Sequence, residues 1–198
     1  MTTRNPTGDL YATILLMIPA ENSGVPVAAA NPFTSGDVIG ILRERGWLIG
    51  YATDKQIAWC ARAALMLGGH VADRAGLAEL IGLVFCYDAR EIIARVESHV
   101  VLSRYAARNV LRQVARMLLE GGALTSERFK EIATAMKEGM DIRGRELFHP
   151  IRLALAGRAG EGDLDRVILL LDEAAGLDFA VQVKSARKRM LEFCSVLD

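Results

Sequence analysis

The stretch Arg143-Gly-Arg-Glu-Leu-Phe-His-Pro-Ile-Arg-Leu-Ala-Leu-Ala-Gly157 decides the fold of the second half of this chain. Pro150 fits the first turn of a helix, where its missing N–H costs no hydrogen bond, and Gly157 fits the position just beyond a helix end. The stretch therefore predicts a short helix over residues 150–156. A second helix is predicted over residues 163–175, because an aspartate can cap its start and a glycine follows its end.

Helix signals also dominate the sequence that precedes this stretch. Capping residues stand before apolar runs, glycines follow the runs, and no proline occurs between Pro32 and Pro150. Leu and Ala, with Arg and Glu between them, favour helices by propensity. The predicted helices cover residues 37–45, 54–67, 75–86, 88–99, 103–120, 125–139, 150–156, 163–175 and 179–197. The sequence therefore predicts an all-α fold.

The first 35 residues differ from this helical body. Residues 19–36 contain three prolines together with Asn, Ser and Gly, a composition typical of a loop or linker. The apolar run over residues 10–18 is too short to span a bilayer as a helix, which needs about 20 residues. A signal peptide is the weaker alternative, because only Arg4 is available for its basic region. We expect a buried strand or short helix here, in a cytoplasmic protein that contacts no membrane.

Composition sets further limits on function. The 198 residues form one domain or two small ones, and 52% of them are hydrophobic. Lys plus Arg equals Asp plus Glu, at 24 each, so the net charge does not predict a polyanionic partner. The three histidines lack metal-ligand spacing, and we expect no metal site and no cofactor. The three cysteines lie far apart in apolar sequence, which predicts buried, reduced thiols at Cys60, Cys86 and Cys194.

Four arginines lie four residues apart, and no acidic residue occurs between positions 98 and 119. On one helix this spacing places the guanidinium groups along a stripe, where like charges repel by roughly a few tenths of a kcal/mol per pair. The stripe therefore predicts an anion supplied from elsewhere. RNA phosphates are one such anion, and the alternative is pairing with Asp and Glu on neighbouring helices. The stripe consists of Arg104, Arg108, Arg112 and Arg116.

The stretch from Arg143 to Gly157 resembles the segment L-F-x-P-[LI]-R-x-A-L-T-G, which opens the final anticodon-binding subdomain of bacterial glutamyl-tRNA synthetases. Residues 163–171 are similar to the helix G-L-F-E-x-L-A-L-L of that family. A weaker likeness joins residues 70–80 and the following Phe85-Cys86-Tyr87 to the family segment R-A-K-T-L-x-E-L and its trailing F-F-F. Residues 43–48 resemble the start of the first anticodon-binding subdomain. The resemblance covers residues 36–176.

The resemblance implies an all-α fold of two small helical subdomains, similar to the anticodon-binding helical cage of glutamyl-tRNA synthetase. The first subdomain is expected over residues 36–122 and the second over residues 123–176. Residues 1–35 are expected to be an N-terminal extension and linker, and residues 177–198 a C-terminal helical extension.

The same resemblance implies that this chain is not an enzyme. Class I synthetases bind ATP with a His-x-Gly-His-type motif and a Met-Ser-Lys-type loop, and the sequence contains neither. It also lacks a G-x-x-x-x-G-K phosphate loop. The length leaves no room for an N-terminal nucleotide-binding domain beside the anticodon-binding part. We therefore expect a stand-alone, truncated paralogue.

The resemblance assigns a role in RNA binding to Arg152, because the arginine of the family's P-x-R segment approaches an anticodon base. The unstacked bases of an anticodon loop suit arginine, which donates to base edges and neutralises phosphates. The alternative is a salt bridge from Arg152 to Glu146 or to Asp165. The basic residues Arg143, Arg145 and Arg158 flank Arg152 and complete the predicted cluster.

Other positions of this region point away from RNA or into the core. Glu161 and Asp163 stand where the family carries Thr-Pro or Gly-Pro, and two carboxylates there would repel RNA by about 1 kcal/mol each. Ala156 replaces the threonine of the family motif. His149 is expected to be a cap or surface residue. The apolar residues of the stretch are expected in the core: Phe148, Leu153 and Leu155.

A last basic cluster contains Lys184, Arg187, Lys188 and Arg189. It predicts either a tail that contacts RNA or an amphipathic helix that docks on the body and leaves its basic side solvated. Docking is the preferred interpretation of the apolar side.

The leading hypothesis is a non-catalytic tRNA-binding protein that contacts the anticodon arm through its arginines. Two alternatives stay open. The first is a protein-interaction or oligomerisation module on the same fold that has lost RNA binding, which the zero net charge and Glu161 favour. The second is an accessory subunit of a split synthetase-like enzyme.

Overall fold

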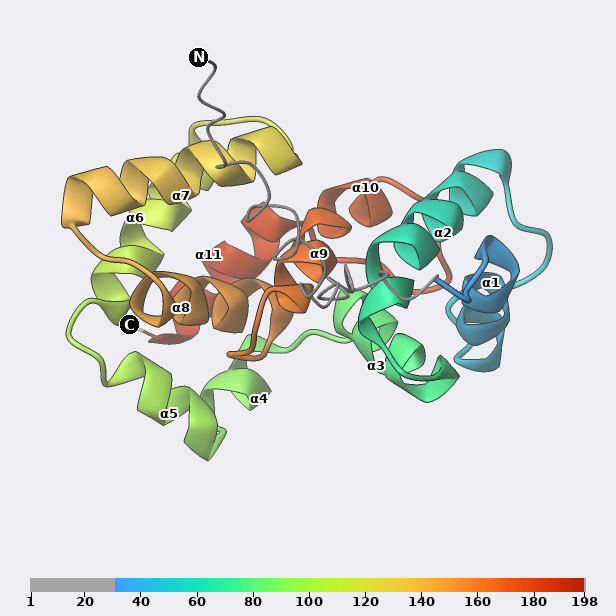
Figure 1. Cartoon of the computed structure of the whole chain (residues 1–198), viewed down its shortest axis with the longest axis horizontal. Coiled ribbons are helices and arrows are strands. Elements are labelled where there is room, and N and C mark those ends of the chain that lie inside the picture. The colour runs from blue at the N-terminus through green and yellow to red at the C-terminus, as the bar shows by residue number, and fades with distance from the viewer. Residues whose placement is uncertain (1–30, 198) are drawn as a thin grey trace, which may run out of the picture. The chain divides into compact units, whose positions relative to one another are not determined.

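The computed structural model describes residues 31–197, which belong to one compact unit (Figure 1). The predicted apolar segment over residues 10–18 lies outside the described residues. All regular structure in the described range is helical, which confirms the predicted all-α fold. The elements are α1 (Ser35–Glu44), α2 (Asp54–Leu67), η1 (Gly68–His70), α3 (Arg74–Phe85), α4 (Ala89–Ile93), α5 (Val96–Leu102), α6 (Ala107–Leu119), α7 (Ser126–Met140), α8 (Arg145–Ala156), α9 (Asp163–Leu169), α10 (Leu171–Ala175) and α11 (Ala186–Leu197).

Side-chain caps explain where several helices begin. Thr34 and Thr53 form capping boxes at the starts of α1 and α2, each bonding reciprocally with the third residue of its helix. Single side-chain caps begin three further helices, from Asp73 at α3, Asp88 at α4 and Thr125 at α7. These caps satisfy backbone N–H groups that have no partner inside their helices.

The structure corrects two predicted helix boundaries in the region of the arginine stripe. The helix predicted over residues 88–99 ends at Ile93, and α5 starts separately at Val96. Ser103 lies at the end of α5, where its hydroxyl donates to the carbonyl of Val100, and it does not cap α6. Because α6 begins at residue 107, Arg104 lies in the preceding turn and only the other three stripe arginines share a helix.

The start of α8 also differs from the prediction. The helix begins at Arg145, so Pro150 lies inside it rather than in its first turn. Proline at this position leaves the carbonyl of Glu146 without its helical partner. Residue 146 is exposed, so water can hydrate that carbonyl. Gly144 precedes the helix with a φ of 55°, a conformation that favours glycine.

The helices pack around one continuous core. Helix α11 packs against α4, α6 and α8, and α9 packs against α2, α3 and α8 (Figure 1). Buried side chains from both sides of residue 122 and from α11 belong to the same apolar cluster. The division of this range into two anticodon-binding-like subdomains stays a prediction.

Aromatic contacts tie the segment before α11 to the first three helices. The rings of Trp47 and Phe85 stack with centroids 4.7 Å apart. Phe179 meets Phe85 and Trp59 edge-on, at 5.1 and 5.4 Å. The indole N–H of Trp59 donates to the carbonyl of Leu170 at 3.2 Å, which satisfies its polar atom inside the core.

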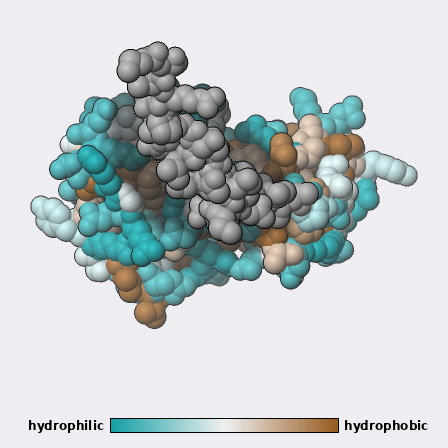
Figure 2. Space-filling view, in the orientation of Figure 1, coloured by the Kyte–Doolittle hydropathy of each residue, from teal (hydrophilic) through white to brown (hydrophobic). Residues whose placement is uncertain are grey.

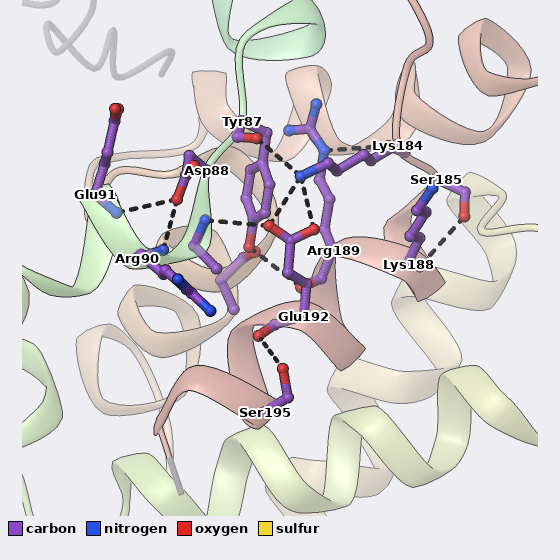
Figure 3. A network of polar contacts seen from close by, with 12 residues as sticks. Tyr87, Asp88, Arg90, Glu91, Lys184, Ser185, Lys188, Arg189, Glu192 and Ser195 are labelled. Atoms are coloured by element: carbon purple, nitrogen blue, oxygen red, sulfur yellow. Dashed lines mark hydrogen bonds and ion pairs between the residues drawn. The ribbon is translucent and has the colours of Figure 1, made fainter.

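Arg189 lies at the centre of a buried polar network (Figure 3). It is 0% exposed, so the prediction that the basic residues of this helix are solvated is wrong for Arg189. Its guanidinium donates to four carbonyls and lies 4.5 Å from the centroid of the Tyr87 ring. The acceptors are Leu83 and Leu155 at 2.8 Å, Val84 at 2.5 Å and Lys184 at 3.1 Å.

Three of these carbonyls belong to the last turns of α3 and α8, where helices leave carbonyls unpaired and carry partial negative charge. The guanidinium of Arg189 therefore supplies hydrogen-bond donors to the carbonyls at the ends of both α3 and α8. Burial lowers the pKa of Arg189 to about 10, so the side chain stays charged at neutral pH. Beside it, Lys184 pairs with Glu192 at 2.7 Å (Figure 3).

The cysteines only partly fit the prediction of buried thiols. Cys60 is buried, whereas Cys86 is exposed and Cys194 is half-buried; none of the three is in a disulfide. Cys86 immediately follows the last residue of α3, where the chain leaves the core. Burial raises the pKa of the Cys60 thiol to about 12.

Residues 31–197 contain neither a helix suited to a membrane nor a cluster suited to a metal ion. None of their helices combines the length and the apolar character that crossing a bilayer requires. These residues also contain no cluster of three or more His, Cys, Asp or Glu side chains that could hold a metal ion.

We predict that Cys86 is alkylated by iodoacetamide at pH 8 while Cys60 is not. At this pH only about one Cys60 thiol in ten thousand is ionised, and the thiolate is the reactive form. Peptide mapping by mass spectrometry, with and without urea, measures both sites. Labelling of Cys60 in the folded protein at the rate of Cys86 would contradict the structure. The Cys60→Ala variant is the control, because the slowly labelled site should be missing from it.

We also predict that Arg189→Met lowers the free energy of unfolding by at least about 3 kcal/mol, because it leaves buried carbonyls without donors. Urea unfolding followed by circular dichroism measures the change. The matched control is Lys188→Met, one residue earlier and exposed, which should change stability by less than about 0.5 kcal/mol. Similar values for the two variants would refute the role given to Arg189.

Candidate nucleic-acid interface

Two arginines, one just before α8 and one at its first position, have charges that are available at the surface. Arg143 lies 3.9 Å from Asp141, and Arg145 lies 3.4 Å from Glu161. All four side chains are strongly exposed, and ion pairs of this kind contribute about 0–1 kcal/mol. Both guanidinium groups can therefore exchange a carboxylate for another anion at little cost.

Arg152 has a different environment from its neighbours. The residue is 8% exposed, and its guanidinium binds both carboxylate oxygens of Asp165, at 2.7 and 2.8 Å. It also donates to the carbonyl of Gly160 at 2.7 Å and lies 5.1 Å from the centroid of the Phe148 ring. This is the salt bridge to Asp165 that the sequence left open as an alternative to base contact.

These bonds shape the turn between α8 and α9, residues 157–162. Gly157 has a φ of 80°, and a Cβ there would lie 3.1 Å from Ile92, so both conformation and space favour glycine. Arg95 donates to the carbonyl of Gly157 at 3.1 Å. Arg158 pairs with Glu79 of α3 at 2.5 Å, with both side chains about half exposed. Arg152 therefore stabilises the turn on which the exposed side chains of Arg158 and Glu161 lie.

Arg104 approaches the predicted cluster from the turn before α6. Its guanidinium lies 3.3 Å from Nδ1 of His149 and 3.4 Å from the carbonyl of Arg145. Burial lowers the pKa of His149, and the surrounding arginine charges lower it further. The imidazole is therefore neutral at pH 7, with Nδ1 accepting from Arg104. His149 is half-buried, deeper than the cap or surface position expected from the sequence.

An open groove of about 610 Å³ lies between α7 and α8, and its lining includes Arg143 and Lys137 together with Glu138 and Asp141. The half-buried ring of Phe148 lines it, with the ammonium of Lys137 5.6 Å from the ring centroid. Leu153 and Leu155 are buried, as predicted, but Phe148 only partly enters the core. Lys137 was not among the predicted site residues. It lies on α7, and no pattern in the sequence indicated its contact with the ring of Phe148.

The other stripe arginines lie on α6, and the structure brings only Arg104 to the α8 cluster. Arg108 donates to the carbonyl of Leu197 at 3.3 Å, and Arg116 pairs with Glu120 of the next turn at 3.0 Å. Arg112 is exposed and lines a small pocket with Arg108, Leu111, Cys194 and Leu197. The part of the stripe on α6 therefore lies beside α11.

These features place the chain among all-α domains with exposed arginines beside an open groove. Residues 30–175 match the family described as Anticodon binding domain. Because this match spans most of the chain, the chain belongs to the anticodon-binding domain family.

Three curated relatives are glutamate–tRNA ligases. Glutamate–tRNA ligase 2 of Syntrophus aciditrophicus (strain SB) is 32% identical over 73 residues, 37% of this chain and 15% of that protein. The Sulfurihydrogenibium sp. (strain YO3AOP1) enzyme is 38% identical over 71 residues, 36% of this chain and 13% of that protein. The Carboxydothermus hydrogenoformans (strain ATCC BAA-161 / DSM 6008 / Z-2901) enzyme is 29% identical over 98 residues, 50% of this chain and 20% of that protein. The matches thus span at most a fifth of these relatives, and no solved structure matches the chain.

We predict that Asp165→Asn lowers the free energy of unfolding by about 2 kcal/mol, because it removes the charged partner of the largely buried Arg152. The matched control is Asp163→Asn on the same helix, whose expected effect is below about 1 kcal/mol. Chemical denaturation of both variants, of Arg152→Gln and of each variant combined with Arg152→Gln gives the coupling energy. A coupling near zero would show that the Arg152–Asp165 bond does not stabilise the turn.

Proposed function

We propose that this chain is a non-catalytic tRNA-binding protein that contacts the anticodon arm through arginines. The observation that carries the proposal is its membership of the anticodon-binding domain family over residues 30–175. The ligase activity in the names of its relatives belongs to proteins of which the matches cover at most a fifth. We propose no ligase activity for this chain, and a cytoplasmic location suits a partner of this kind.

The arginines of the proposed site divide into two roles. Arg143, Arg145 and Arg158 are exposed and bind only exposed carboxylates, so they meet RNA phosphates directly. Arg152 acts as a positioning residue, because its guanidinium is committed to Asp165 and to the turn. Arg104 is the stripe arginine that reaches this site, where it lies 3.4 Å from the carbonyl of Arg145, whereas Arg108, Arg112 and Arg116 lie on α6.

The acidic residues of the α8–α9 turn are compatible with this proposal. Glu161 lies 3.4 Å from Arg145, so its charge is partly compensated before RNA arrives. Asp163 is in the first turn of α9, where the helix dipole favours a negative charge. The half-buried Phe148 in the groove offers a face on which an unstacked base of the loop can lie.

An exposed apolar surface favours a second function, binding of a protein partner. Val96 and Val100 lie four residues apart on α5 and are 77% and 59% exposed, and Tyr105 follows in the next turn. Figure 2 shows apolar residues at the tip of α5, in the lower left of the view. The first experiment therefore has to distinguish RNA binding from apolar association.

We predict that bulk tRNA binds the full chain at about 50 mM salt and binds much more weakly at about 200 mM, because arginines release counterions from the RNA. Arg143→Gln/Arg145→Gln should reduce the slope of log affinity against log salt by about two. The matched control is Arg45→Gln/Lys55→Gln, which removes two exposed cations near α1 and α2. Fluorescence anisotropy of labelled tRNA measures all three proteins.

Failure to bind tRNA at about 50 mM salt would reject the RNA-binding function and favour the protein-interaction alternative. Equal losses in the two double variants would reject the α8 site in particular. Copurification of a chain that carries ATP chemistry would instead favour the split-enzyme alternative.

A further inference from the structure

We propose that α6 and α11 together form a second RNA-binding surface, which takes the phosphate backbone of a double-helical stem. This inference rests on the proposed function, because it extends RNA binding beyond the anticodon loop. Helix α11 follows residue 175, so this surface is not contained in the region that the family match covers.

Two helices from distant parts of the sequence meet here in antiparallel order. Arg187, near the start of α11, donates to the carbonyl of Leu119 at the end of α6. Arg108, near the start of α6, donates to the carbonyl of Leu197 at the end of α11. The two helices pack directly against each other (Figure 1). The stripe arginines of α6 and Arg187 of the last basic cluster therefore lie beside each other.

The cations are spread over this surface in two dimensions. Successive stripe arginines advance about 6 Å along α6, and packed helices lie about 8–10 Å apart. Arg108, Arg112 and Arg116 of α6 are exposed, as are Arg187 and Lys188 of α11. Among the described residues of these two helices and their ends, Glu120 is the exposed acid, and it pairs with Arg116. The surface therefore carries a net positive charge.

Double-helical RNA fits this array better than a single strand does. A duplex presents rows of phosphates on a broad face, with one charge per about 1.7 Å of axis in the case of DNA. Single strands are bound with aromatic side chains on which bases stack. The exposed uncharged residues of α6 and α11, which are Asn109, Gln113, Leu119, Leu191 and Ser195, include no aromatic ring. Arginine predominates over lysine here, which suits bidentate phosphate contacts.

The test compares the full chain with variants on a blunt 16-base-pair RNA duplex that has no loop. Arg108→Gln/Arg187→Gln should reduce the salt slope of duplex binding by about two, because two phosphate contacts are lost. Arg108→Lys/Arg187→Lys keeps the charge and should keep the slope. A second double variant, Arg116→Gln/Lys188→Gln, should also reduce the salt slope of duplex binding. It leaves the hydrogen bonds of Arg108 and Arg187 between the two helices intact. Circular dichroism confirms that each variant is folded.

The outcomes separate this inference from the proposed function. Loss of duplex binding in the α6–α11 variants, with duplex binding retained in Arg143→Gln/Arg145→Gln, supports the second surface. If tRNA binding depends on Arg143 and Arg145 but no α6–α11 variant changes it, the inference fails and the proposed function stands. If only the α6–α11 variants weaken RNA binding, the inference stands and the α8 site is rejected. Binding to anionic phosphatidylglycerol vesicles but to no RNA would overturn both.

Discussion

The buried guanidinium of Arg189 is the interaction on which the rest of the fold depends. Helices α3 and α8 both end beside it, and carbonyls in their last turns would be buried without donors if it were absent. One planar cation with five N–H groups can serve several carbonyls in fixed directions, which an ammonium group cannot. The C-terminal end of α8 is therefore fixed against α3, and the opposite end of α8 carries the exposed arginines of the candidate interface.

Arginines that look alike in the sequence have unlike tasks because their solvation differs. Arg152 and Arg189 satisfy internal acceptors, and removing either leaves buried groups unpaired. Arg143 and Arg145 have only exposed carboxylates beside them. Such a cation is held weakly, so it remains able to bind an incoming anion. The buried arginines build the surface, and their exposed neighbours carry its charge.

The sequence predicted the helices whose ends are set by local chemistry. The glycines after Leu67 predicted the end of α2, and Thr125 predicted the start of α7, so short-range patterns suffice there. The cap of α2 is Thr53, whereas the sequence had suggested Asp54. Short-range patterns did not predict that the helix ends at Ile93. There the buried hydroxyl of Ser98 donates to the carbonyl of Ile92 at 2.5 Å. They also could not place Arg189 in the core, because its acceptors Leu83 and Val84 lie more than a hundred residues away. Arg152 had two open interpretations, and the fold realises the salt bridge to Asp165.

The position of Arg189 in the chain has a consequence for folding during synthesis. Domains generally fold as they emerge, from the N-terminal side, at about 5–20 residues per second. A nascent chain that ends near residue 180 already contains every helix from α1 to α10 but lacks the cation that closes α3 and α8 together. The ends of α3 and α8 therefore lack these donors until α11 arrives, and during that interval the faces of α4, α6 and α8 that α11 covers are exposed to chaperones and to other nascent chains.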